Sequence, residues 1–202
     1  IARLLPNGNL DNSFDGDGKR VLTPLPGVAF YPYQVLVQAD GRLLVSGARK
    51  SDPFKAAPCR FTAGGDIDAS FGGQPANPGC YVTGLDGCSV AYAVALQDDG
   101  KIVATVDLLS SDQAAVLRLT TEGVPDLAFS DDGYVALPNA NGLRSIVVTS
   151  DGNYVVGGWH YSSPPYANAD FYVARIAPTQ SALDPGFNNG TGEISVGFDL
   201  GV

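Results

Sequence analysis

Pairs of short apolar runs separated by an Asp-Gly dipeptide recur three times along the chain. The flanking runs are 34–38 and 43–45 around Asp40-Gly41, 93–97 and 102–104 around Asp99-Gly100, and 145–149 and 154–156 around Asp151-Gly152. Asp-Gly between β-forming runs is the strongest short-range hairpin signal, because both central residues of a type I′ turn need positive φ. The pattern therefore predicts three β-hairpins.

The first run of each hairpin is apolar at successive positions instead of alternating, as in Val35-Leu36-Val37 and Ile146-Val147-Val148. Strands of this kind have both faces covered by other elements. We therefore expect these strands in the middle of the protein.

A second phrase, containing Arg, Asp and Phe, recurs at a spacing of 57 or 58 residues. Its full copies are Arg3, Leu4, Gly8, Leu10, Asp11 and Phe14; Arg60, Phe61, Gly65, Ile67, Asp68 and Phe71; and Arg118, Leu119, Gly123, Pro125, Asp126 and Phe129. A looser fourth copy is Arg175, Ile176, Leu183, Asp184 and Phe187. Self-similarity at a fixed period of tens of residues is typical of stacked structural units, so the chain is expected to be a repeat protein.

Each repeat is expected to contain four antiparallel strands. The hairpin supplies two, a third ends at the recurring Arg, and a fourth follows the Asp-x-x-Phe phrase near Arg20, Tyr81, Val135 and Ile194. A four-stranded antiparallel unit repeated in tandem is typical of a β-propeller blade. The fold prediction is an all-β propeller, with an open β-solenoid as the alternative.

The strand count predicts about 3.5 blades in a single repeat domain over residues 1–202. Residues 1–23 would be an outer half-blade, and the complete blades would cover about 33–83, 90–137 and 143–198. An unfinished blade exposes a strand edge that proteins normally cover. Two copies would make seven blades, so we expect a homodimer that closes one ring; the alternative is a fragment of a longer array. The start at Ile1 and the absence of Met favour a piece of a longer precursor.

The recurring Arg, Asp and Phe are interpreted as structural because they appear in every repeat. The Arg fork can hold the carboxylate and nearby carbonyl groups, the Asp can cap the turn, and the Phe can pack between units. The residues concerned are Arg3, Asp11, Phe14, Arg60, Asp68, Phe71, Arg118, Asp126, Phe129, Arg175, Asp184 and Phe187.

The repeat resembles the delta-60 repeat family of β-propellers. The first unit carries the matching residues Arg3-Leu4, Gly8, Leu10-Asp11-Asn12-Ser13-Phe14, Gly18-Lys19, Asp40-Gly41 and Val45-Ser46-Gly47. The second and third units depart from the pattern, for example at Val106 and Gly133-Tyr134. The resemblance implies a propeller of bacterial envelope or secreted proteins and no general activity.

Composition narrows the classes of partner. With 21 acidic against 12 basic residues and a net charge of -9, the chain would be repelled by nucleic acids and anionic membranes. No apolar stretch approaches the roughly 20 residues that span a bilayer, so neither nucleic-acid binding nor membrane insertion is expected.

The three cysteines, Cys59, Cys80 and Cys88, all lie in the second repeat. Their spacing fits no zinc motif, and His160 is the only histidine, so no structural metal is expected. We expect a disulfide between Cys59 and Cys80, because they lie on strands expected to be neighbours. The alternatives are a Cys80–Cys88 pair or three reduced thiols. A disulfide would imply a secreted or periplasmic location.

Candidate ligand-binding residues are the aromatic and polar side chains of two expected loops, 24–32 and 159–170. They are Phe30, Tyr31, Trp159, His160, Tyr161 and Tyr166. Aromatic side chains beside small polar residues are suited to stacking on sugar rings or holding a peptide; the alternative is that they pack over the edge of the unit and anchor a long loop. The leading hypothesis is a non-catalytic binding or scaffold propeller that recognises a glycan or a peptide; a structural module of a larger surface protein is another reading.

An enzyme is the alternative reading. A hydrolase or lyase would use carboxylates such as Asp86, Asp107 and Asp170, and His160 could form a triad with Ser162 or Ser163 and Asp170. No cofactor is expected, although Asp11, Ser13, Asp15, Gly16 and Asp17 resemble the start of a calcium loop that lacks its terminal Glu. A catalytic reading requires these groups to converge on one point.

Overall fold

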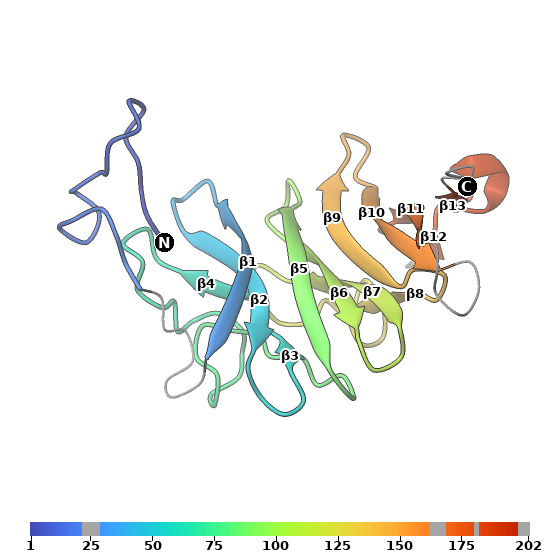
Figure 1. Ribbon diagram of the computed structural model, residues 1–202, viewed down its shortest axis with the longest axis horizontal. Coiled ribbons are helices and arrows are strands. Elements are labelled where there is room, and N and C mark those ends of the chain that lie inside the picture. Colours follow the sequence, from blue (N-terminus) through green and yellow to red (C-terminus); the bar gives the residue numbers. More distant parts are fainter. Residues whose placement is uncertain (22–28, 162–168, 180–181, 198–202) are drawn as a thin grey trace, which may run out of the picture.

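Three antiparallel sheets follow one another along the chain and stand side by side (Figure 1). The computed structural model describes residues 1–21, 29–161, 169–179 and 182–197. The first sheet contains β1 (Phe30–Val37), β2 (Leu43–Arg49), β3 (Lys55–Ala56) and β4 (Cys59–Phe61). The second contains β5 (Ser89–Leu96), β6 (Ile102–Leu108), β7 (Gln113–Leu119) and β8 (Tyr134–Leu137). The third contains β9 (Gly142–Val148), β10 (Tyr154–Tyr161), β11 (Ala169–Ala177), β12 (Ala182–Leu183) and β13 (Glu193–Val196), with the 3-10 turn η1 (Asn188–Gly190) before β13.

The second sheet has the simple order β5-β6-β7-β8, and the other two are variants of it. In the first sheet β3 and β4 pair with opposite ends of β2, so together they occupy the third strand position, counted from β1. Residues 80–83 lie in the fourth place, where Tyr81 and Thr83 donate backbone hydrogen bonds to Pro58 and Ala56. In the third sheet β11 pairs with β10 on one side and with both β12 and β13 on the other. The fold is therefore all-β, with the four-stranded antiparallel blades of a partial propeller, as predicted.

Residues 1–21 form the two outer segments of a further unit, which we call the N-terminal half-blade. The bridges Ala2–Lys19 and Leu4–Leu10 join these segments. The first sheet has the equivalent bridges Cys59–Cys80 and Phe61–Ile67 in its outer half. The half-blade therefore repeats the outer half of a blade, without a hairpin inside it among the residues that the structure describes.

The core lies between neighbouring sheets and is formed by apolar side chains from facing strands. Leu44 and Phe71 pack with Val94 and Leu117 between the first and second sheets. Phe129, Tyr154 and Tyr172 are fully buried between the second and third sheets, where Phe129 meets Tyr154 edge-on at 5.9 Å. Each blade is thus stabilised by its neighbour, as in other repeat proteins.

The three predicted hairpins are present as β1–β2, β5–β6 and β9–β10, but their turns are not of the type I′ associated with Asp-Gly. Gly41, Gly100 and Gly152 have φ of 82°, 82° and 84°, but the preceding aspartates are absent from the left-handed region. In the first turn, Gly41 N–H donates to Gln38 O, and Gln38 N–H to Arg42 O, which makes a three-residue loop with glycine at its end. The aspartate instead accepts from the second following amide, as Asp40 does from Arg42 N at 3.0 Å.

The expectation that both faces of each first strand are covered is also wrong at the two ends of the array. Val35 and Val37 on β1 and Val147 on β9 are at least half exposed. Val94 on β5, in the middle sheet, is buried. The difference arises because the end sheets have a neighbouring blade on one face only.

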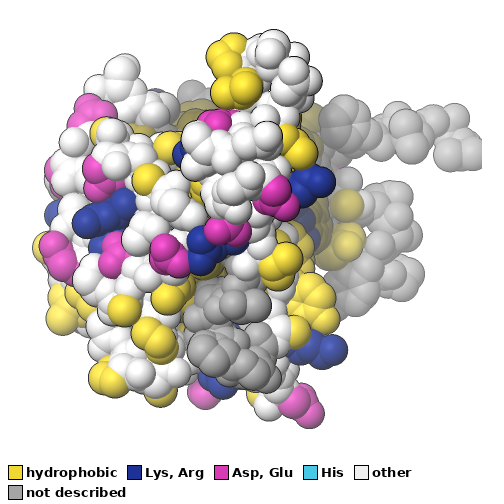
Figure 2. All heavy atoms as spheres, turned by 90° about the vertical axis from the view of Figure 1, so that its left-hand side faces the viewer, with side chains coloured by type: hydrophobic (Ala, Val, Ile, Leu, Met, Phe, Trp, Pro, Cys, Tyr) yellow, Lys and Arg dark blue, Asp and Glu magenta, His cyan; other side chains and the backbone are white. Residues whose placement is uncertain are grey.

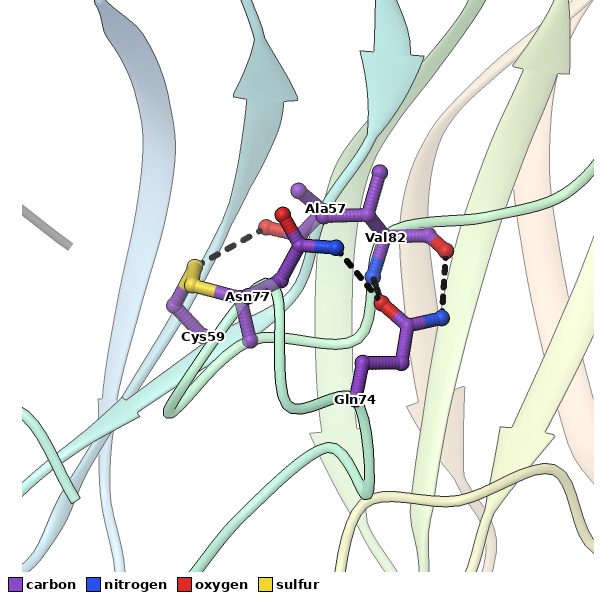
Figure 3. Close-up of a disulfide and its surroundings, with 6 residues drawn as sticks. Ala57, Cys59, Gln74, Asn77 and Val82 are labelled. Carbon is purple, nitrogen blue, oxygen red and sulfur yellow. Dashed lines mark hydrogen bonds between the residues drawn. A yellow bond between two sulfur atoms is a disulfide. The ribbon is translucent and has the colours of Figure 1, made fainter. Parts of the chain in front are cut away.

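The disulfide between Cys59 and Cys80 is present, as predicted, and joins the third place of the first sheet to the fourth. Beside it, Gln74 Nε2 donates to Val82 O at 2.8 Å, and Val82 N–H donates to Gln74 Oε1 at 2.9 Å (Figure 3). Cys88 is a free thiol. None of the described segments forms a helix of the length and apolarity needed to cross a membrane.

Candidate functional site: the inner-edge row

Each blade begins with a strand that contains a β-bulge, and the bulges fall at equivalent positions. The pairing register shifts at Tyr33 on β1, at Tyr92-Ala93 on β5 and at Arg144 on β9. A bulge leaves a residue without a cross-strand partner and redirects its side chain. Because β1, β5 and β9 follow one another across the molecule (Figure 1), the bulges bring side chains from three blades together.

Three bulge side chains, Tyr33, Tyr92 and Arg144, form a continuous row with Trp159 of β10, and we call this set the inner-edge row. The ring centroids of Tyr33 and Tyr92 are 4.5 Å apart. The Arg144 guanidinium carbon lies 3.5 Å from the Tyr92 centroid and 4.2 Å from the Trp159 centroid. Arginine between two aromatic rings gains cation–π attraction on both sides, so its plane is held in place.

Asp107 on β6 holds Arg144 in position within the row. Its carboxylate is fully buried and accepts from Leu143 N–H at 2.8 Å and from Arg144 Nη1 at 2.6 Å. Burial raises the pKa of Asp107, although both hydrogen bonds and the charge of Arg144 act in the opposite direction. The ion pair therefore positions Arg144 and neutralises part of its charge, while its side chain stays exposed at the surface.

Further hydrogen bonds link the first two strands of the first blade to the first strand of the second blade. Ser46 Oγ donates to Tyr92 O at 2.9 Å, and Val94 N–H donates to Gln34 Oε1 at 2.7 Å. These contacts tie the backbone beside one bulge to the neighbouring blade. The relative positions of Tyr33 and Tyr92 are thus set by packing and by hydrogen bonds.

Phe30 and Tyr31 lie in β1, and the expectation of a loop there is wrong. A methyl group added to Gly47 would lie 2.3 Å from the Phe30 ring, so this ring occupies the space that the glycine leaves open on the adjacent strand. Tyr31 contacts Phe54 with ring centroids 5.6 Å apart. Both aromatic residues therefore pack on their own sheet.

Trp159, His160 and Tyr161 also lie in a strand, because β10 continues to Tyr161. The Trp159 ring covers Gly142 in the same way, since an added methyl group there would approach it to 2.1 Å. His160 Nδ1 lies 2.6 Å from Asn139 O, which places a proton on Nδ1, and Tyr161 N–H donates to Asn141 Oδ1 at 2.7 Å. Tyr166, Ser162 and Ser163 lie outside the described residues.

The predicted aromatic residues thus fall into two groups, on the first and third sheets, with the second sheet between them. Of the two groups, only Trp159 joins the inner-edge row. Sequence reasoning missed Tyr33, Tyr92 and Arg144, yet a signal was available. Each lies seven residues before the aspartate of an Asp-Gly pair, at Asp40, Asp99 and Asp151.

Cavities open beside residues of the first and third sheets. Tyr33 lines a cavity of about 450 Å³ with Phe30, Gln34 and Val35. His160 lines another of about 470 Å³ with Asn139 and Glu193. A larger, polar cavity of about 630 Å³ lies at the opposite end of the strands, between the Asp-Gly loops of the first two blades.

Asp107, considered for catalysis, and the aspartates considered for calcium have other partners. Asp107 is paired with Arg144, and Asp11 and Asp15 are paired with Arg3 and Arg20. Asp17 accepts from Lys19 N–H at 2.9 Å. Within the ranges that the structure describes, no cluster of three or more His, Cys, Asp or Glu side chains could hold a metal ion. The residues suggested for a calcium loop are therefore engaged in turn and ion-pair contacts.

The recurring Arg, Asp and Phe are in contact in all four copies. Arg Nε lies 2.8, 2.7, 2.8 and 2.6 Å from Asp Oδ2 in the pairs Arg3–Asp11, Arg60–Asp68, Arg118–Asp126 and Arg175–Asp184. The guanidinium carbon lies 5.0, 4.7, 4.5 and 5.5 Å from the centroids of Phe14, Phe71, Phe129 and Phe187. We call each set a clamp.

Two clamps also reach the next unit. Arg60 Nη1 donates to Thr121 O at 2.6 Å, and Arg118 Nη1 donates to Pro178 O at 3.2 Å and to the Tyr154 hydroxyl at 3.1 Å. The clamp thus holds a turn within its own blade and bonds to the neighbouring blade.

The clamps predict a loss of stability in acid. Burial raises the pKa of Asp126, but contacts with Lys101, Ala128 N–H and Arg118 outweigh it and lower the pKa below the ordinary 3.8. Asp68 is partly buried, and its contacts with Ser70 and Arg60 likewise outweigh the effect of burial and lower its pKa. The unfolded state therefore binds more protons, so the free energy of unfolding should fall as the pH drops below about 4. In urea unfolding between pH 6 and 3, the free energy of unfolding of Asp126→Asn should fall less with decreasing pH than that of the native chain. An equal fall in both proteins would show that protonation of Asp126 does not contribute to the loss of stability in acid.

Part of the chain matches a protein-family model. Residues 1–14 and 97–129 match the family described as domain of unknown function (DUF5122) beta-propeller. Both segments contain a complete Arg-to-Phe phrase, from Arg3 to Phe14 and from Arg118 to Phe129. A comparison with curated proteins found no match. The match in these two segments confirms the resemblance to a β-propeller family of unknown function, and the three sheets have the arrangement of a partial propeller.

Proposed function

We propose that the chain is a non-catalytic binding propeller that recognises a glycan or a peptide along the inner-edge row. The observation that carries the proposal is the contact between Tyr33, Tyr92 and Arg144, which come from three successive blades. None of these side chains is fully buried, although they touch one another. Exposed, pre-positioned aromatic and arginine side chains are the residue types that dominate binding energy in recognition surfaces.

The chemistry of the row favours a neutral ligand with both apolar and hydroxyl-bearing surface, which describes a glycan. The aromatic rings offer flat apolar area, and their hydroxyl groups and Arg144 offer hydrogen bonds. Asp107 offsets the charge of Arg144, and the net charge of -9 disfavours an acidic ligand. A peptide with small polar side chains is the second ligand class to test.

Binding is expected outside the cytoplasm. The Cys59–Cys80 disulfide supports this part of the proposal, because disulfides persist in oxidising compartments. Measuring the redox state of the two thiols in the native host tests it directly. Fully reduced cysteines in the mature protein would contradict the expected location.

The binding proposal is tested with a glycan array and a peptide library, followed by titration calorimetry on the best ligand. Tyr33→Ala and Arg144→Gln should each weaken binding about tenfold or more, which corresponds to about 1.4 kcal/mol. Leu127→Ala, at a highly exposed apolar residue outside the row, is the matched control and should bind like the native chain. Unchanged affinity in both row variants, or no binding in either library, would contradict the proposal and favour a structural module.

A further inference from the structure

The N-terminal half-blade presents an unpaired strand edge. Arg3 N–H donates a hydrogen bond to Gly18 O, and Arg3 O accepts one from Asp11 N–H, both within the half-blade. Along an extended strand, successive backbone groups point to opposite sides, so the groups of Ala2 and Leu4 point the other way. In the described part of the chain, no backbone hydrogen bond uses them.

The equivalent edge in the complete blades is occupied by the hairpin. Arg60 bonds outward to Gly79 O and Asp68 N–H in the same manner as Arg3. Its neighbours Cys59 and Phe61 pair with Val45 and Leu43 of β2. In the second blade, Leu119 pairs with Ile102 of β6. The repeat itself therefore shows which kind of strand belongs beside Ile1–Leu4.

Side chains that are buried in the complete blades are exposed along this unpaired edge. Leu4 is 59% exposed, whereas its counterparts Phe61 and Leu119 are 1% and 0% exposed. The first sheet leaves Val35 and Val37 exposed on the face toward the half-blade. In the middle sheet, the counterpart of Val35 is Val94, which is buried. An apolar surface that is covered in one repeat and open in another marks a missing neighbour.

A groove runs between the N-terminal half-blade and the first sheet. A cavity of about 300 Å³ separates Ile1, Ala2 and Phe14 from Val35 and Val37. The cavity beside Tyr33 continues the opening, because Ile1 and Val35 line both. Figure 2 looks onto this end of the molecule and shows hydrophobic side chains between clusters of acidic and basic ones.

We propose that the N-terminal half-blade binds a β-hairpin of a further repeat of this type. Its second strand pairs antiparallel with Ile1–Leu4, and the residues opposite Ala2 and Leu4 correspond to Val45 and Leu43 of the first blade. Its first strand covers Val35 and Val37, in the way that the hairpin of the first blade covers Val94 on β5. The hairpin carries the Asp-Gly loop and apolar residues toward the first sheet, so hydrogen bonds and apolar burial act together, as in β-strand addition.

A second copy of the chain fits this groove less well. The homodimer remains a prediction, but two copies bring two outer half-blades, and both require an inner hairpin. The three hairpins of each copy already lie inside their own blades. The docking proposal does not depend on the binding proposed for the inner-edge row.

A fluorescein-labelled peptide of residues 89–108, the hairpin of the second blade, tests the proposal by fluorescence anisotropy. We expect saturable binding with one peptide per chain. Leu4→Asp should weaken it at least tenfold, while Leu127→Asp, at an equally exposed leucine, should not. A peptide with Ala104→Pro should fail to bind, because Ala104 pairs with the third strand and proline removes its N–H.

Amide exchange followed by NMR gives a second readout. On binding, exchange of the Leu4 amide should slow at least tenfold, while the Arg3 amide, already bonded to Gly18 O, should change little. Absence of saturable binding, or an unchanged Leu4 amide, would overturn the proposal. Concentration-dependent dimerisation that protects Leu4 without peptide would also overturn it, in favour of a second copy.

Discussion

Replacing Arg118 with alanine is expected to lower the free energy of unfolding by about 3 kcal/mol, as for other buried ion pairs that lose one partner. The Arg118 and Asp126 side chains are 6% and 7% exposed and lie 2.8 Å apart. The substitution removes the bonds to Tyr154 and Pro178 as well. Lys101, whose Nζ lies 3.1 Å from Asp126, retains part of the compensation, which keeps the expected loss at the lower end of the range.

The four copies of the clamp supply matched controls for this prediction. The arginine side chains are 43%, 6%, 6% and 26% exposed at Arg3, Arg60, Arg118 and Arg175. Arg3→Ala should therefore cost about 1 kcal/mol or less, since exposed ion pairs contribute little. Urea unfolding monitored by circular dichroism gives both values. Equal losses for Arg3→Ala and Arg118→Ala would show that burial does not set the contribution of the clamp.

Removing the disulfide by the double substitution Cys59→Ala and Cys80→Ala is expected to cost about 3 kcal/mol, the loop-entropy value for a closed loop of about 20 residues. The bond spans a sequence separation of 21 and holds the outer edge of the first blade. Both half-cystines are fully buried in a cluster with Val45, Phe61 and Val82.

Cys88→Ala is the control for the disulfide prediction, because this thiol is free and only partly buried. Its midpoint of urea unfolding should stay close to that of the native chain. A reducing agent should shift the native midpoint to that of the double variant and leave the double variant unchanged. A double variant as stable as the native chain would show that the bond adds nothing to the blade.

The repeat made the architecture predictable. Contacts such as Arg60–Asp68 and Arg60–Phe71 join residues eight and eleven positions apart. The spacing within the Arg-to-Phe phrase therefore reflects contacts between residues that are close in sequence. The pairing of Cys59 with Cys80 followed from the same alignment of units, because it assigned the two residues to neighbouring strands.

The candidate site was less accessible to sequence reasoning. A β-bulge has no residue signature of its own, so nothing in Tyr33 or Arg144 taken singly marks it as a bulge. The end of β10 was also missed: the strand continues through Trp159 to Tyr161, and Gly142 on the adjacent strand leaves room for the indole ring. Polar and aromatic residues there resemble a loop in sequence, although they pair with β11.

The exposure of Val35 and Val147 depends on which neighbours the blades have, and local hydrophobicity carries no such information. Both residues belong to apolar runs that are typical of buried strands. The chain places them on the outer faces of its first and third sheets. Repeat proteins bury such faces only when a further unit stacks on them.

The proposed binding of a ligand along the inner-edge row is tested most directly by aromatic ¹H–¹³C NMR spectra recorded while the best-binding glycan or peptide is titrated into the native chain. We expect the ring signals of Tyr33 and Tyr92 and the indole signals of Trp159 to shift together and to saturate with the calorimetric affinity. Saturating shifts confined to residues elsewhere, such as Tyr81 or Tyr134, with the row unchanged, would contradict the claim.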